Sequence, residues 1–170
     1  MLAALMIAAA LTGQAGPGST GCSPTPETRT VRETHNSVSC FVHWLYGPGT
    51  LETLTPLGDD RARVFTPSLV TLMERARADE DSTAFDADPI CQCQDPGSLR
   101  LLFVGVLAAE TDRAVAHVAF DFAGTATTMA VEEEATHVIL TLDRPEGGEW
   151  RINDIVPLQA GSFRRSLRGN

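Results

Sequence analysis

Four apolar segments in the second half of the chain constrain the fold more than any other feature. The first, residues 99–109, is apolar almost throughout, and the later ones place an apolar side chain at every second position, as a half-buried strand does. The later segments are residues 117–122, 138–142 and 150–156. Strands that follow one another along the chain with short connections predict an antiparallel meander.

Helical patterns precede the strands. Between Val31 and Tyr46, apolar residues recur at three- and four-residue spacings, which predicts an amphipathic helix. A second helix is predicted from Thr66, a good N-cap residue, with Pro67 at its first position. The segment 161–168 predicts a short C-terminal helix. Helices followed by a meander indicate an α+β fold.

Composition favours one domain and excludes one class of partner. A chain of 170 residues with 43% hydrophobic residues can bury a single sizeable core. Its formal net charge of -9 argues against binding of nucleic acid, because such proteins need a basic surface to neutralise phosphates. We therefore expect one domain over residues 30–170 and no nucleic-acid partner.

The amino terminus predicts export. The apolar run at residues 2–12 is too short to span a bilayer, which requires about 20 helical residues. It fits the apolar core of a signal peptide that ends at Ala15, followed by a linker over residues 16–29. This predicts a periplasmic or secreted protein with no transmembrane span in its mature chain. The alternative is a lipid anchor on Cys22, although Ser19 stands where a lipoprotein signal usually has an aliphatic residue.

Residues 86–96, DADPICQCQDP, hold two of the four cysteines. A zinc site needs four ligands, and one cysteine pair with scattered histidines does not supply them, so we expect no metal and no cofactor. An exported chain meets an oxidising compartment, which favours a disulfide between Cys40 and Cys91 or Cys93. We favour Cys40–Cys91, which would close a loop of about 50 residues and add roughly 3 to 4 kcal/mol. A direct Cys91–Cys93 bridge and buried free thiols remain the alternatives.

Two Asp-Pro pairs in this stretch predict turns, because the carboxylate can accept backbone N–H groups while proline fixes the next φ angle. These pairs are Asp88-Pro89 and Asp95-Pro96. We therefore interpret the stretch as the connection that leads the chain from the helices into the sheet.

Together these features resemble a bacterial secreted family, domain of unknown function 3828. The resemblance spans residues 30–168 and rests on Asp88-Pro89, Gln94-Asp95 and the final strand, residues 150–155. That family belongs to the nuclear transport factor 2-like, cystatin-like superfamily. It implies a cone-like fold in which two N-terminal helices pack on a curved four-stranded meander. It brings no established catalytic residues.

The candidate site residues follow from the last strand. Alternation places Trp150, Ile152 and Asp154 on one face, so Asp154 would point into the cone. Trp150 and Asp154 are then candidate ligand-binding residues, and Asp154 a candidate general base with Asp95 or His117 nearby. We favour a structural role for Asp154.

The sequence therefore predicts a non-enzymatic envelope module that binds a small apolar ligand or an envelope protein. The alternative is a small acid-base enzyme, of a hydrolase or isomerase type, that uses Asp154. The oligomeric state and the identity of the partner do not follow from the sequence.

Overall fold

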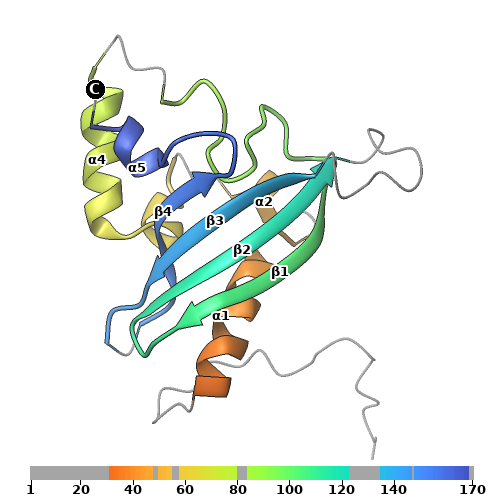
Figure 1. Ribbon diagram of the computed structural model, residues 1–170. Coiled ribbons are helices and arrows are strands. Elements are labelled where there is room, and N and C mark those ends of the chain that lie inside the picture. The colour runs from red at the N-terminus through yellow and green to blue at the C-terminus, as the bar shows by residue number, and fades with distance from the viewer. Residues whose placement is uncertain are drawn as a thin grey trace, which may run out of the picture.

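The chain forms an α+β fold built on a four-stranded antiparallel sheet with the strand order β1-β2-β3-β4 (Figure 1). The structure, a computed structural model, describes residues 31–47, 50–54, 58–79, 84–122, 135–146 and 148–168. The strands are β1 (Leu99–Ala109), β2 (Arg113–Phe122), β3 (Thr136–Asp143) and β4 (Arg151–Pro157). The predicted meander is confirmed. The predicted signal peptide, the linker and Cys22 lie outside the described residues.

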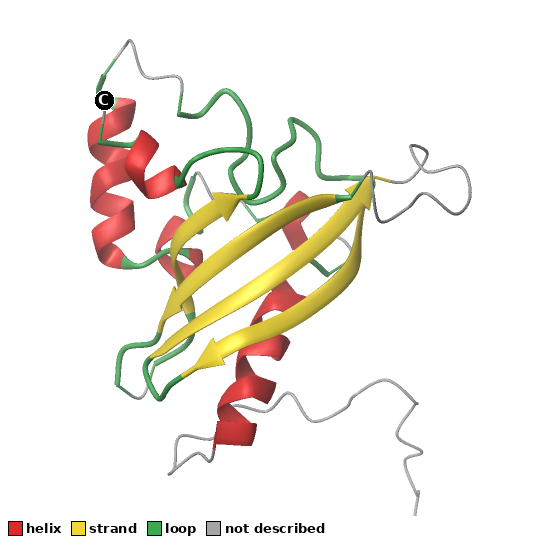
Figure 2. Ribbon diagram, viewed as in Figure 1, coloured by secondary structure: helices red, strands yellow, loops and turns green. Residues whose placement is uncertain are grey.

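The helices lie behind the sheet and beside β4, as Figure 2 shows. They are α1 (Val31–Leu45), α2 (Thr50–Thr53), α3 (Arg61–Val64), α4 (Pro67–Arg77) and α5 (Phe163–Ser166). The two longer helices and the C-terminal helix are those that the sequence predicts. The short helices α2 and α3 fall in a segment whose residues show no clear period.

Helix α1 forms because its apolar residues make one stripe. Val38, Val42 and Leu45 on that stripe are completely buried, and the helix packs against β1 and β2. The turn after it needs glycine, since a Cβ atom at Gly47 would lie 2.8 Å from the carbonyl oxygen of His43.

Helix α4 begins as predicted. The Thr66 hydroxyl accepts a hydrogen bond from the N–H of Leu69, and Pro67 occupies the first helical position. The N–H of Thr66 also donates to the carbonyl oxygen of Ile152 on β4, at 2.9 Å. The start of the helix is therefore attached to the last strand.

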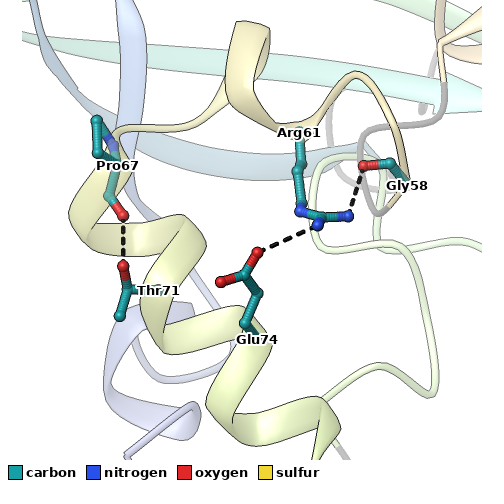
Figure 3. A network of polar contacts seen from close by, with 5 residues as sticks. All are labelled: Gly58, Arg61, Pro67, Thr71 and Glu74. Atoms are coloured by element: carbon teal, nitrogen blue, oxygen red, sulfur yellow. Dashed lines mark hydrogen bonds and ion pairs between the residues drawn. The ribbon is translucent and has the colours of Figure 1, made fainter.

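A polar network ties α3 to α4 (Figure 3). The guanidinium of Arg61 donates to the carbonyl oxygen of Gly58 at 3.0 Å and to the carboxylate of Glu74 at 3.1 Å. On the far side of α4, the Thr71 hydroxyl donates to the carbonyl oxygen of Pro67. Both side chains of the Arg61–Glu74 pair are partly exposed, so the pair positions the turn more than it stabilises the fold.

The sheet has an inner face, which the helices cover, and an outer face. Strand pairing places Val118 on β2 between Val104 of β1 and Val138 of β3, and this row points inward into the core. His117 is paired with Gly105 and Ile139 in the next row, which points outward. In Figure 2 no helix of the described chain lies in front of the outer face.

A β-bulge in β4 changes which side chains face the core. Thr141 is paired with Asp154, but Leu142 is paired with Ile152, so Asn153 is an extra residue in the ladder. After this bulge the buried residue is Ile155, with no exposed surface. The predicted alternation is therefore wrong beyond Ile152, and Asp154 shares the outer face with Thr141.

Candidate functional site

The carboxylate of Asp154 holds the C-terminal segment. It accepts hydrogen bonds from the Ser162 hydroxyl at 2.6 Å, from the N–H of Arg164 at 2.8 Å, and from the N–H of Ile155 at 2.8 Å. Both oxygens are thus occupied, and Asp154 fixes the start of α5 against β4. Its oxygens act here as acceptors for structural donors.

The bulge residue strengthens the same junction. The side-chain and main-chain oxygens of Asn153 accept hydrogen bonds from the guanidinium of Arg164, at 2.7 and 3.1 Å. The Thr66 hydroxyl also donates to the side-chain oxygen of Asn153, at 3.3 Å. The junction therefore links α4, β4 and α5.

The other residues predicted around Asp154 lie elsewhere. The carboxylate of Asp95 accepts a hydrogen bond from the N–H of Gly97 at 2.9 Å, which is the turn role that the sequence also predicts. His117 lies on β2, and β3 separates it from β4. The structure does not bring these three residues together into an acid-base site.

Trp150 is part of the core and not of an open pocket. Its ring is 4% exposed, and its indole N–H donates to the Ser37 hydroxyl of α1 at 2.9 Å. The guanidinium of Arg144 lies 4.8 Å from the ring centroid. These contacts give Trp150 a packing role between the last strand and the first helix.

The outer face of the sheet carries a histidine pair. His117 Nε2 lies 3.0 Å from His137 Nδ1, and the two rings stack with centroids 5.2 Å apart. At this distance one nitrogen carries a hydrogen and the other accepts it. Burial, and then the charge of His137, lower the pKa of His117, so its ring favours the neutral form.

An exposed aromatic ring lies beside this pair. The ring of Phe103 is 5.5 Å from that of His117 and leans over Gly105, where a Cβ atom would lie 2.8 Å from it. Phe103 is 50% exposed, and Leu107, further along β1, is 61% exposed. Phe103 on the outer face and Leu107 at a bulge of β1 therefore present apolar side chains to solvent along the edge strand.

A charge pair between an exposed arginine and a buried aspartate closes one end of this face. The guanidinium of Arg100 on β1 donates through Nε to the carboxylate of Asp121 on β2 at 3.0 Å, and a second nitrogen donates to the other oxygen. The hydrogen bond from Arg100 lowers the pKa of Asp121, which has only 4% exposure. The pair keeps Asp121 charged near the end of β2.

The disulfide joins Cys91 to Cys93, so the favoured Cys40–Cys91 pairing is wrong. The chain reverses within this turn, because the N–H of Asp88 donates to the carbonyl oxygen of Cys93 at 2.8 Å and Gln92 has a positive φ of 54°. This brings the two Cα atoms within 5.1 Å. Cys40 is also disulfide-bonded.

This small disulfide contributes little to stability. By the chain-entropy relation, a loop this short gains about 1 to 2 kcal/mol, whereas a 50-residue loop would gain about 4 kcal/mol. The left-handed conformation of Gln92 costs about 1 to 2 kcal/mol for a residue with a side chain. The bridge therefore contributes less to folding than the predicted long-range disulfide would.

Asp88 makes the predicted turn and is itself partly buried. Its carboxylate accepts hydrogen bonds from the N–H of Ile90 at 2.7 Å and from that of Cys91 at 3.4 Å. Burial nevertheless raises the pKa of Asp88, and it also raises the pKa of Tyr46, whose hydroxyl donates to the carbonyl oxygen of Ile90. Desolvation outweighs the two hydrogen bonds at Asp88.

The sequence analysis missed two residues of the outer face, Phe103 and His137. The pairing register of β2 and β3 places His137 opposite Ala119 and on the same face as His117, so the pair follows from that register and not from the pattern of either strand alone. Phe103 follows a bulge at Leu102 in β1, which no periodicity predicts.

The described part of the chain shows neither a metal-binding cluster nor a membrane-spanning helix. In this part of the chain no three histidine, cysteine, aspartate or glutamate side chains gather as a metal site would require. None of its helices has the length and apolar character needed to cross a membrane. Comparison of the chain with protein-family models, curated proteins and solved structures finds no match.

Proposed function

We propose that this is an exported, non-enzymatic binding module of the secreted family domain of unknown function 3828, with the cone-like fold of the nuclear transport factor 2-like superfamily. Its partner is an extended segment of an envelope protein, which pairs with the free edge of β1 and packs on the outer face. The exposure of Phe103 and Leu107 on an edge strand is the observation that carries this proposal.

The edge of β1 suits the addition of a strand. Within the described residues, the strand has a sheet neighbour on one side only, β2, and its 11 residues contain a single charge, at Arg100. Main-chain groups on the free side give affinity to an added strand, and side chains on the face give specificity. Exposed apolar side chains on the face fit an apolar segment of a protein partner.

Two observations support a protein partner over the alternatives. The oxygens of Asp154 accept hydrogen bonds at the junction with α5, which argues against their use by an acid-base enzyme. Side chains of the core, including Tyr46 stacked on Phe120 at 5.3 Å, cover the inner face of the sheet. This argues against the binding of a small ligand inside the cone. The disulfide-bonded state of Cys40, Cys91 and Cys93 supports a periplasmic or secreted location.

A crosslinking experiment tests the proposal. A photoreactive amino acid replaces Phe103 in the full chain expressed in its own cell, and a matched chain carries it at the exposed Arg75 of α4. We expect an adduct with another protein from position 103 and none from position 75. Leu107→Asp, added to the first chain, should abolish that adduct. Equal adducts from both positions, or none from 103, would contradict the proposal.

A further inference from the structure

We propose that Cys91–Cys93 is a redox-active disulfide that exchanges with an external dithiol, and that Cys93 is the sulfur attacked. The proposal does not depend on the binding face of the sheet. It assigns a thiol–disulfide exchange site to the turn between α4 and β1.

The bridge contributes little to holding the turn. It spans only one intervening residue, and that residue, Gln92, has a φ of 54° although it is not glycine. The turn is already held without sulfur, because Gln92 N–H donates to the carbonyl oxygen of Asp88 and the Gln92 side chain donates to that of Pro89. The dithiol form can therefore keep the same fold.

The two cysteines of the bridge differ in exposure. Cys91 is completely buried in the core, whereas Cys93 is partly exposed. A thiolate must approach along the S–S axis to attack, so access selects which sulfur it reaches. Solvent access from one side only gives the exchange a defined entry point at Cys93.

The exchange has two steps. A thiolate of the external dithiol attacks Cys93 Sγ, the Cys91–Cys93 bond breaks, and its electron pair goes to Cys91 Sγ, which takes up a proton. The second thiolate of the dithiol then attacks the dithiol's first sulfur, which is bonded to Cys93 in the mixed disulfide, and releases Cys93 as a thiolate. The cysteine pair gains two electrons, and the dithiol becomes a disulfide.

The environment of Cys91 fits this direction of electron flow. The buried sulfur receives the electron pair, and a buried thiolate requires a proton. The turn also holds an ionisable group at the backbone of Cys91, since the Asp88 carboxylate accepts a hydrogen bond from the N–H of Cys91 at 3.4 Å. Burial raises the pKa of Asp88, so this carboxyl holds a proton at higher pH than an exposed aspartate does.

Titration with a glutathione redox buffer tests the site in the full exported chain. Free thiols are alkylated at each buffer ratio and located by mass spectrometry, and circular dichroism follows the fold. We expect Cys91 and Cys93 to become reduced while the disulfide of Cys40 stays closed and the fold is retained. Opening of both disulfides at the same ratio, or loss of the fold when Cys91–Cys93 opens, would overturn the proposal.

Two single variants test the point of entry. Cys91→Ser leaves Cys93 as the reactive thiol, and Cys93→Ser leaves Cys91, so each is the other's control. With glutathione disulfide as the probe, we expect Cys93 to form the mixed disulfide at least about tenfold faster than Cys91. Equal rates, or a faster reaction at Cys91, would show that Cys93 is not the entry point.

Discussion

Asp154 shows how one side chain can fix a chain end. Asp154→Ala removes the acceptor for the Ser162 hydroxyl and for the N–H of Arg164, so we expect the free energy of unfolding to fall by about 1 to 3 kcal/mol. Asp154→Asn keeps one carbonyl acceptor and should lose less. Urea unfolding, followed by circular dichroism, measures both. A variant that unfolds like the wild type would show that the junction carries no stability.

The raised pKa of Asp88 predicts that the stability of the fold depends on pH. Because burial raises the folded-state pKa, the folded chain holds its proton to higher pH than the unfolded chain does. The contribution of Asp88 to stability is therefore complete at pH values below its pKa in the unfolded chain. It falls as pH rises toward the pKa of Asp88 in the folded chain, and it stays lower above that value. Asp88→Asn keeps an acceptor for the N–H of Ile90 without the charge and should remove this fall.

The matched variant for this test is Asp88→Ala, which removes the acceptor as well. We expect it to be about 0.5 to 2 kcal/mol less stable than Asp88→Asn at neutral pH, because the N–H of Ile90 loses its partner. Thermal unfolding between pH 3.5 and 7.5 compares the three chains. The same pH slope in wild type and Asp88→Asn would assign the effect to another group.

At the residue scale, the sequence predicts local contacts and not tertiary ones. The turn roles of Asp88 and Asp95 follow from residues two positions away, so they were predictable. The orientation of Asp154 depends on the extra residue Asn153, which is stabilised by Arg164 and Thr66 from elsewhere in the chain. The Cys91–Cys93 pairing depends on the positive φ of Gln92, which the sequence pattern does not predict.

At the element scale, the start of α4 offers a direct test. Thr66→Ala removes the side-chain cap on the N–H of Leu69, so we expect a loss of about 0.5 to 2 kcal/mol in the free energy of unfolding. Thr66→Ser keeps the hydroxyl and serves as the control. Guanidinium unfolding of the two variants should separate them. Equal loss in both would assign the effect to the methyl group of Thr66 and not to the cap.

The longer elements were predictable because each buries one continuous face. Helix α1 and strand β1 lie within one residue of their expected bounds, since their apolar patterns extend over many positions. Helices α2 and α3 have four residues each, which is too short for any period to appear. Their positions are set by contacts with α1, α4 and β4.

At the scale of the whole molecule, the net negative charge opposes association of two copies through the apolar edge of β1. The chain carries a formal charge of -9 at pH 7, and this repulsion keeps copies apart at low salt. Near its pI of about 4.8 the repulsion vanishes, while Phe103 and Leu107 stay exposed on an edge strand. We therefore expect a monomer at pH 7.5 and association through β1 near pH 5, measured by light scattering after size-exclusion chromatography.

Two variants with the same change in charge separate the edge from the overall charge. Leu107→Glu places a charge on β1, and Leu158→Glu places one after β4, the opposite edge of the sheet, where Leu158 is 62% exposed. We expect Leu107→Glu to weaken association at pH 5 by about tenfold or more, because a buried leucine contributes about 1.5 to 3 kcal/mol. Leu158→Glu should leave it nearly unchanged. If both variants weaken it equally, net charge governs association and the β1 edge is not the contact.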